Sequence, residues 1–397
     1  MQQRSVVLVA ARRTPMGRFM GAFADLPAVD LGVAAATAAL DAAGLSPAEV
    51  QETVAGHGRQ AGNGPNPARQ VSVRAGVPET VPAYTVNKAC GSSAKALALA
   101  AGSIILDELD VALVVGMENM TRTPYLLRGM RGGYRMGDAV VEDAMSSDGF
   151  MDPLAGEAMG ETAENLAERY DVGREEQDAF ALRSQQRATA AWAAGRFADE
   201  VVPVDTVDAK RRTRTVERDE QPRSDTTLEG LARLKPVFRD PGTVTAGNSS
   251  GICDGAAALV VMAEDAARAR GIRPMARVVG WASAGVDPHI MGWGVVPATH
   301  KLLAKLGWAL PDIDVVEVNE AFAAQVLACD RELKFDWDRT NVNGGAIALG
   351  HPIGMTGARI VGAVAHELQR QGARRGLATL CISGGQGMAV ALERTEP

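Results

Sequence analysis

The chain has 397 residues, of which 46% are hydrophobic and 22% are charged, and its formal net charge is −7 at pH 7. This composition indicates a globular protein that can bury a large core, and the length predicts two or three domains. The acidic balance argues against nucleic acid, or an anionic membrane surface, as the main partner.

Cysteine usage and the first residues favour a cytoplasmic protein. The four cysteines form no CxxC pair, which argues against a zinc finger or a disulfide scaffold and favours a reducing compartment. Residues 6–11 are apolar but too short for a signal sequence or a membrane span. We interpret residues 6–10 as the first strand.

Beyond this strand, short β-branched runs alternate with alanine-rich helical stretches, which predicts a parallel α/β architecture. Residues 31–43 predict a helix that ends at Gly44, and residues 46–49 form a capping box with proline at the first helical position. Residues 56–68 are rich in Gly, Asn and Pro and predict a loop. Residues 111–116 predict a buried strand.

Cys90 lies between an apolar lead-in at residues 84–86 and a small-residue helix predicted over residues 94–101. This pattern predicts a strand-to-helix turn. The N-terminus of a helix lowers the pKa of a thiol and favours the nucleophilic thiolate. The segment alone equally allows a buried cysteine that acts as a small hydrophobe.

An internal resemblance links the two halves of the chain. Residues 39–50 and 302–313 each read as a helix, a glycine stop, and then proline, an acid and an apolar residue. Val-Asn at residues 86–87 recurs at residues 342–343, ahead of a glycine-rich run. Two copies of one α/β unit would place equivalent turns side by side, with a shared site between them.

Between the copies, residues 121–245 read as an inserted subdomain. Residues 161–194 predict one or two helices joined by Asp-Val-Gly at residues 171–173. The basic run at residues 210–214 is most simply a solvated hairpin, although arginine side chains would also suit phosphate groups of a ligand.

The second half carries polar groups at predicted strand ends. The strand at residues 315–318 ends at Asn319, a glycine-rich run at residues 344–350 leads to His351, and Cys381 ends another strand. Ligands of open α/β sheets bind at such ends. We therefore expect these residues to share a site with Cys90.

These motifs resemble the thiolases, a family of acyl-CoA acetyltransferases, over almost the whole chain. The resemblance implies two similar α/β halves packed in layers with an inserted loop domain, assembled as a homodimer or homotetramer. It divides the chain into an N-terminal half (1–120 plus 246–270), a loop domain (121–245) and a C-terminal half (271–397). The motifs that carry it lie at residues 11–18, 87–93, 159–165, 319–322, 344–354 and 381–387.

The resemblance also implies catalytic roles. Cys90 would accept the acyl group as a thioester, with His351 as the base that takes its proton. Cys381 would move the proton of the α-carbon, and His351 with a water held by Asn319 would stabilise the enolate oxygen. The backbone N–H groups of Cys90 and Ser383 would form a second oxyanion hole.

Coenzyme A thioesters would be the substrates, with no metal or separate cofactor required. For Met159, Phe238 and Met291, plain core packing explains the residue as well as ligand contact does. The residues implied to bind coenzyme A and the acyl chain are Arg223, Ser250, Ala246, Phe238, Met159, Phe150, Met291, Ala321 and Phe322.

Several positions depart from the family pattern. Ala158 replaces a histidine of the short-chain members, and Ser383 replaces a glycine that would tolerate a positive φ angle. Cys253 replaces an asparagine, Gly-Ser-Ser-Ala at residues 91–94 changes the end of the nucleophile motif, and Trp293 is placed to narrow the channel. These departures bear on acyl-chain preference more than on reaction type.

Three functions are therefore compared. The first is a thiolase that condenses acyl-CoA units or cleaves 3-ketoacyl-CoA, with chain length and physiological direction left open by the sequence. The second is a decarboxylating condensing enzyme of the same fold, against which Cys381 argues. The third is a non-catalytic acyl-CoA binding protein, against which the full set of Cys90, His351, Asn319 and Cys381 argues.

Overall fold

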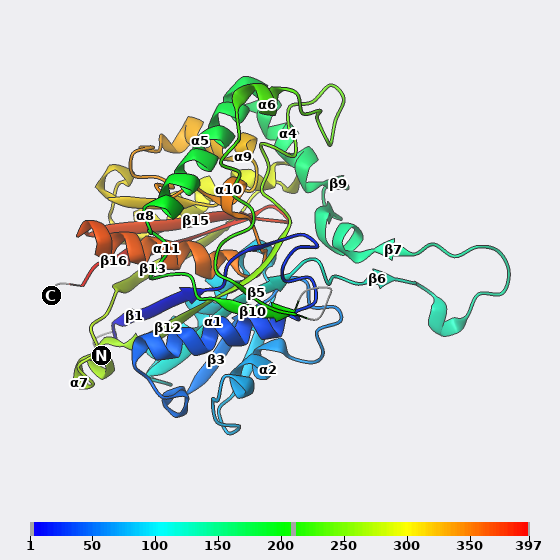
Figure 1. Cartoon of the computed structure of the whole chain (residues 1–397). Coiled ribbons are helices and arrows are strands. Elements are labelled where there is room, and N and C mark those ends of the chain that lie inside the picture. The colour runs from blue at the N-terminus through cyan, green and yellow to red at the C-terminus, as the bar shows by residue number, and fades with distance from the viewer. Residues whose placement is uncertain (1–3, 208–211, 396–397) are drawn as a thin grey trace.

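The computed structural model describes residues 4–207 and 212–395. Helices cover a large mixed sheet in strand order β14-β15-β16-β13-β1-β12-β5-β3-β4, with β2 (Gly17–Arg18) paired to β12 (Figure 1). Within these residues, no helix has the length and apolar character needed to cross a membrane. The other strands of this sheet are β1 (Val6–Arg13), β3 (Glu52–Gly56), β4 (Ala83–Val86), β5 (Val111–Asn119), β12 (Cys253–Ala263), β13 (Ala276–Gly285), β14 (Val315–Val318), β15 (Arg375–Ile382) and β16 (Gln386–Glu393).

The two halves of the chain repeat one arrangement, as the internal resemblance predicted. From the junction where β1 pairs with β13, the order is β1-β12-β5-β3 on one side and β13-β16-β15-β14 on the other. The helices repeat as well, because α1 (Ala28–Ala43) corresponds to α8 (Val295–Leu306), and α3 (Ser92–Ile105) to α11 (Thr356–Gln371). The remaining helices outside the inserted segment are α2 (Pro67–Arg74), α7 (Glu264–Ala269), α9 (Ala323–Leu333) and α10 (Ala346–Leu349).

The expectation of a parallel sheet is wrong for its centre. Strand β3 pairs parallel with β4 and β5, and β14 pairs parallel with β15. The strands between them, β5, β12, β1, β13, β16 and β15, are antiparallel neighbours. Strands β15 and β16 are joined by a tight turn in which Gly384 and Gly385 have φ angles of 80° and 73°, so no crossover helix separates them.

Helices α3 and α11 pack against each other through small side chains. A Cβ atom on Gly357 would lie 2.3 Å from the backbone nitrogen of Ala94, so only glycine permits this approach. The backbone N–H of Ala358 also donates to Oγ of Ser93 at 2.9 Å. Because Cys90 precedes α3 and His351 precedes α11, the contact brings the two turns together.

Replacing Gly357 by alanine is expected to lower the free energy of unfolding by about 1–3 kcal/mol, because the new methyl group overlaps backbone atoms of α3. Gly102→Ala is the matched control, since a Cβ atom there meets nothing within 4 Å. It should raise the free energy of unfolding by about 0.5–1 kcal/mol, as is usual inside a helix. Urea titrations of both variants measure the difference, and equal effects would contradict the packing argument.

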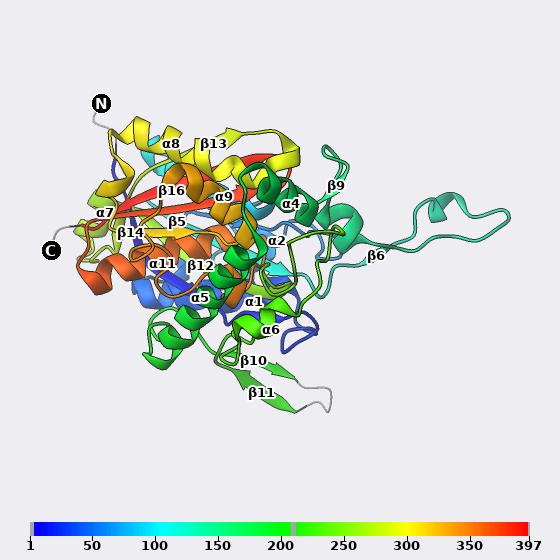
Figure 2. The ribbon, with the colours of Figure 1, turned by 90° about the horizontal axis from the view of Figure 1, so that it is seen from above.

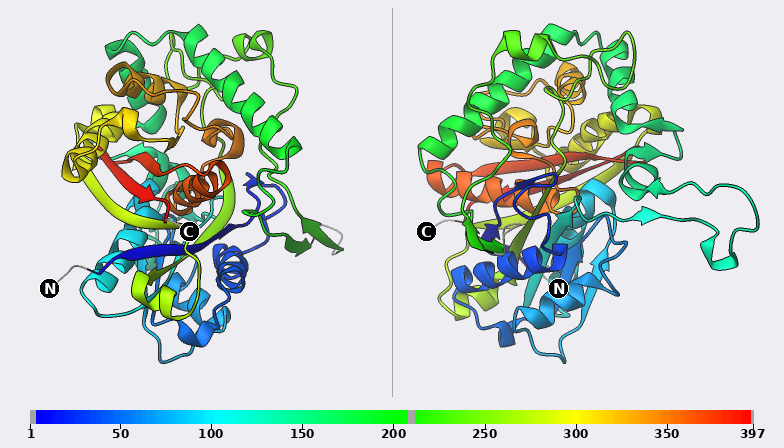
Figure 3. Two further views of the ribbon diagram at one scale, coloured as in Figure 1. Left: turned by 90° about the vertical axis from the view of Figure 1, so that its left-hand side faces the viewer. Right: turned by 45° about the vertical axis from the view of Figure 1, so that its right-hand side comes forward.

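The strands of the inserted segment lie outside the large sheet and form separate two-stranded pieces. A long arm projects from the body between β6 and β7, on the side away from both chain termini (Figures 1 and 3). The helices predicted over residues 161–194 are confirmed as α4 and α5. The elements of the segment are β6 (Tyr125–Leu126), η3 (Met130–Gly132), β7 (Glu142–Asp143), η4 (Ser146–Phe150), β8 (Met151–Asp152), β9 (Glu157–Ala158), α4 (Met159–Arg169), α5 (Arg174–Ala193), β10 (Val204–Val207), β11 (Thr213–Val216) and α6 (Leu228–Ala232).

The hairpin predicted around the basic run corresponds to β10 and β11, which pair from Val204 with Val216 to Val207 with Thr213. Figure 2 shows it extending from the body. Lys210 and Arg211, which formed part of that prediction, lie outside the described residues.

Candidate active site

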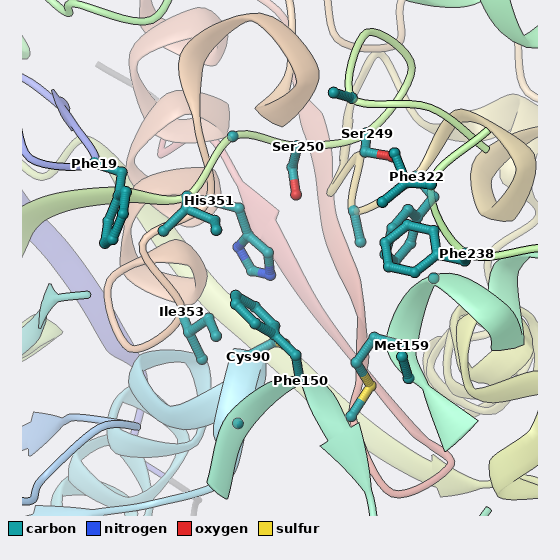
Figure 4. A pocket seen from close by; sticks show the side chains of 18 of the residues that line it. Phe19, Cys90, Phe150, Met159, Phe238, Ser249, Ser250, Phe322, His351 and Ile353 are labelled. Atoms are coloured by element: carbon teal, nitrogen blue, oxygen red, sulfur yellow. The ribbon is translucent and has the colours of Figure 1, made fainter. Parts of the chain in front are cut away.

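A pocket of ≈ 650 Å³ with mostly apolar walls lies where the two halves of the chain and the inserted segment meet (Figure 4). Asn319 and Cys381 are buried behind its wall, next to residues that line it. The sequence-predicted residues on the wall itself are Cys90, His351, Ser383, Arg223, Ser250, Ala246, Phe238, Met159, Phe150, Met291, Ala321 and Phe322.

Cys90 occupies a short 3₁₀ turn, Ala89–Gly91, between β4 and α3. Ala89 has a φ angle of 43°, a strained conformation for alanine, and its N–H donates to Oδ1 of Asn87 at 2.9 Å. A Cβ atom on Gly91 would lie 2.4 Å from the Ile382 side chain, so glycine lets this turn pack against the end of β15. The small residues therefore fix the position of the thiol relative to Cys381.

The prediction that the Cys90 thiol has a lowered pKa is wrong. Burial raises the pKa of Cys90, and the N–H of Ser383 and the charge of Arg59 only partly oppose this rise. The apolar walls of the pocket destabilise the thiolate more than its surroundings stabilise it. The resting group is therefore a thiol, and a nearby base is needed to make it nucleophilic.

His351 lines the same pocket and has the properties that such a base needs. The hydroxyl of Thr356 donates to the carbonyl oxygen of Pro352 at 3.0 Å and lies 2.6 Å from Nδ1 of His351. The hydroxyl must then accept from Nδ1–H, which leaves the lone pair on Nε2. Burial, together with the charges of Arg359 and Arg59, lowers the pKa of His351 to about 3. The imidazole is therefore neutral and able to accept a proton.

This lowered pKa predicts a pH-dependent stability. Below the ordinary histidine value of 6.5, the unfolded chain binds a proton at His351 that the folded protein excludes until about pH 3. Acidification therefore favours unfolding, by about 2 kcal/mol between about pH 8 and about pH 5. Urea titrations across this range should show a fall in stability that is smaller by that amount in His351→Gln. Parallel curves for the two proteins would contradict the assigned protonation state.

Asn319 and Cys381 complete the arrangement from behind the wall. Asn319 follows β14, and its Nδ2 lies 3.5 Å from Nε2 of His351, while its buried Oδ1 has no hydrogen-bond partner in the part of the chain that the structure describes. Cys381 is 1% exposed, and burial together with the neighbouring Cys90 raises its pKa well above the ordinary value. The second thiol is therefore protonated at rest.

The turn after β15 brings a backbone donor to the site. The N–H of Ser383 is near enough to Cys90 to oppose the rise in the pKa of the thiol, and Gly384 N–H donates to Oδ2 of the buried Asp152 at 2.8 Å. In this turn the left-handed conformations fall on Gly384 and Gly385, and Ser383 does not have a positive φ angle. The serine is thus accommodated without backbone strain.

The other departures from the family pattern fall in different places. Ala158 lines the pocket, whereas Cys253 is fully buried beside Gly350. Trp293 stacks on Tyr170, with ring centroids 4.3 Å apart, and does not line the pocket. The expectation that Trp293 narrows the channel is therefore wrong, because its ring is held against Tyr170, just after the end of α4.

Two residues of the site were missed in the sequence. Thr356 orients His351, but a threonine at the start of a helix carries no sign of this role. Arg59 lines the pocket and acts on the pKa values of Cys90 and His351. It was hidden in a segment that reads as an ordinary glycine-rich loop.

Comparison with known proteins identifies the family. Residues 6–265 match the model of the thiolase N-terminal domain, and residues 272–394 match that of the thiolase C-terminal domain. The chain is 51% identical to an acetyl-CoA acetyltransferase of Pseudomonas aeruginosa, over 98% of this chain and 100% of that protein.

Solved structures agree with this match. An acetyl-CoA acetyltransferase of Bacillus anthracis and the human mitochondrial 3-ketoacyl-CoA thiolase each superpose with a TM-score of 0.96 at 44% identity, over 99% of both chains. The human enzyme in complex with CoA gives a TM-score of 0.95 at 44% identity, over 99% of this chain and 98% of that one. The chain therefore belongs to the thiolase family.

Proposed function

We propose that this protein is an acyl-CoA acetyltransferase that works through a covalent acyl-enzyme on Cys90. It would catalyse the reversible condensation of acetyl-CoA with acetyl- or acyl-CoA, or the CoA-dependent cleavage of 3-ketoacyl-CoA. The observation that carries the proposal is the meeting of two thiols, a neutral histidine and an amide at one pocket built from both halves of the chain.

In the first step, the Cys90 sulfur attacks the carbonyl carbon of the substrate while Nε2 of His351 takes the thiol proton. The N–H groups of Cys90 and Ser383 then donate to the oxyanion of the tetrahedral intermediate. The effect of the Ser383 N–H on the pKa of Cys90 supports this role, since it requires the donor to lie near the reacting sulfur. The coenzyme A thiolate leaves and takes up the proton from His351.

In the second step, Cys381 removes a proton from the α-carbon of the incoming acetyl-CoA, and the resulting carbanion attacks the acyl group on Cys90. His351 and a water held by Asn319 would stabilise the enolate oxygen, a role supported by the unpartnered Oδ1 of Asn319. In cleavage the same thiol returns the proton, which suits the raised pKa of Cys381.

The part of the pocket lined by Phe238, Phe322 and Ser250 suits the pantetheine chain of coenzyme A. Phe238 and Phe322 pack edge to face at 6.3 Å, and the backbone N–H of Ser250 is fixed by the carbonyl oxygen of Ala321 at 3.0 Å. Arg223 is exposed where the pocket opens, a suitable place for a phosphate group. The coenzyme is part of the substrate, and the thioester activates the α-proton, so the proposed chemistry requires no metal or separate cofactor.

We also propose a homodimer or homotetramer that acts in fatty acid metabolism, including β-oxidation, in the cytoplasm. Assembly is supported by the arm, where Met136, Val140 and Tyr125 are 95%, 78% and 66% exposed. Apolar side chains gathered on one projecting segment favour a protein partner. Light scattering should give the molar mass of two or four chains, and a monomer would refute the assembly.

The first test is CoA-dependent cleavage of acetoacetyl-CoA beside a longer 3-ketoacyl-CoA, followed by the loss of magnesium-enolate absorbance. The proposal predicts cleavage that requires CoA and leaves acetyl-CoA as one product. The ratio of the cleavage rates of the two substrates shows whether the pocket wall around Ala158 leaves room for a longer acyl chain. Absence of cleavage of both, in a folded protein that binds CoA, would favour a binding protein.

A further inference from the structure

Arginine is the only charged residue type on the pocket wall among the described residues. Arg18 and Arg223 are exposed, whereas Arg59 is partly buried on the wall that Cys90 also lines. No aspartate or glutamate of residues 4–207 and 212–395 lines the pocket. The interior therefore offers a cation to whatever enters it.

Part of the Arg59 guanidinium has no partner. Nη1 donates to the carbonyl oxygen of Asp148 at 3.2 Å, but the buried Nε has no hydrogen-bond partner in the described chain, and no described carboxylate pairs with Arg59. The nearby Glu118 is engaged elsewhere. It accepts from the N–H groups of Gly58, Arg59 and Gly354 at 2.9 Å, and it pairs with Nδ1 of His57 at 2.8 Å.

The guanidinium is nevertheless held in one orientation. An ideal Cβ atom on Gly149 would lie 2.6 Å from both Cζ and Nη2 of Arg59, so the bare glycine backbone lets the guanidinium lie against it. The ring centroid of Phe150 lies 5.9 Å from Cζ. With Nη1 bound to Asp148 and Nε buried, Nη2 is the part of the guanidinium that remains to donate a charge-assisted hydrogen bond to a carboxylate.

Arg59 belongs to the wall away from the proposed pantetheine groove. Phe150, whose ring faces the Arg59 guanidinium, and Ile353, which lies beside Gly58, are across the pocket from Phe238 and Phe322 (Figure 4). The positive charge of Arg59 is close enough to Cys90 and His351 to affect both groups: it opposes the rise in the pKa of Cys90 and contributes to the fall in the pKa of His351. An acyl group attached to the Cys90 sulfur would therefore have Arg59 within its surroundings.

We propose that Arg59 makes the enzyme selective for acyl chains that end in a carboxylate; this inference rests on the proposed function. In cleavage, the Cys90 sulfur bonds to the 3-keto carbon, the bond between carbons 2 and 3 breaks, and Cys381 protonates the departing acetyl-CoA carbanion. The ω-carboxyacyl group stays on Cys90 with its carboxylate accepting a hydrogen bond from Nη2 of Arg59. Coenzyme A then takes up this group and releases the Cys90 thiol.

The test uses 3-ketoacyl-CoA substrates of increasing length, each prepared as a pair that ends in a carboxylate or in a methyl group. The purified wild-type enzyme should have the higher kcat/KM for the carboxylate member at the best length. Arg59→Leu should lower the ratio of the two kcat/KM values by about 10- to 100-fold, the range expected for hydrogen bonds to a charged partner.

Three further variants separate this role from others. Arg59→Lys should keep part of the ratio, and Gly149→Ala should lower it without removing the charge, because its methyl group displaces the guanidinium. Arg18→Leu removes an exposed cation from the same pocket and should leave the ratio intact. An Arg59→Leu variant that slows both substrates equally would overturn the inference and make Arg59 a positioning residue for the loop at Asp148.

A wild-type ratio that favours the methyl member would also overturn the inference. Failure of the proposed function is a different result, in which the wild-type enzyme cleaves neither member of any pair. Binding of a nonhydrolysable ω-carboxyacyl-CoA analogue by calorimetry gives a readout that needs no turnover. Its affinity should fall with Arg59→Leu more than that of the methyl-ended analogue.

Discussion

Replacing Cys90 by alanine is expected to lower the rate of 3-ketoacyl-CoA cleavage by about 10⁴-fold or more, the scale seen when a covalent nucleophile is removed. No second thiol can take over, because Cys90 is the only cysteine on the pocket wall among the described residues. The steady-state rate with acetoacetyl-CoA and CoA measures the effect.

Cys329→Ala is the matched control for the loss of a buried thiol. Cys329 lies on α9, donates to the carbonyl oxygen of Gly292 at 3.3 Å and does not line the pocket. Its replacement should leave the rate within the same order of magnitude. Cleavage that persists in Cys90→Ala at a rate near that of the control would refute a covalent mechanism on Cys90.

Cys381→Ala is expected to separate the two steps of the reaction. Condensation and cleavage should fall by about 10²–10⁴-fold, since both require a proton to move at the α-carbon. Exchange of labelled CoA with acetyl-CoA needs only Cys90, His351 and the oxyanion hole, so it should persist at a rate close to that of the wild type. Rapid-quench assays of exchange and condensation on the same sample measure both.

The contrary outcome for this variant is equally clear. The end of β15 packs against the turn that holds Cys90. If exchange and condensation fall together, Cys381 helps to position Cys90 and does not itself carry the proton. Cys381→Ser keeps the volume close to that of the native residue and distinguishes these cases. A structural role predicts recovery of both reactions in the serine variant, whereas proton transfer by a thiol predicts recovery of neither.

The sequence predicted the position of the site better than its electrostatics. Strand-end positions and the internal repeat predicted that Cys90, Asn319, His351 and Cys381 lie close together, as they do in the structure, whereas their catalytic roles stay predictions. The pKa of Cys90 was predicted in the wrong direction, because a helix N-terminus is a local feature whereas burial depends on distant walls. Desolvation by those walls outweighs the local donors.

Other misses have the same origin in long-range structure. The hydroxyl of Thr356 matters only because α11 presents it to Nδ1 of His351, and Arg59 matters only because Gly149, far along the chain, leaves room for its guanidinium. The antiparallel centre of the sheet depends on the return of β12 after the inserted segment. The division of the chain into an N-terminal half, a loop domain and a C-terminal half stays a prediction.

The most direct measurement is mass spectrometry of the protein after brief incubation with acetyl-CoA in the absence of a second substrate. A covalent acyl-enzyme on Cys90 predicts one acetyl group per chain, mapped to the peptide that contains Cys90, absent from Cys90→Ala and removed by added CoA. An acetyl group on another residue, or full cleavage activity without any acetylated intermediate, would contradict this mechanism.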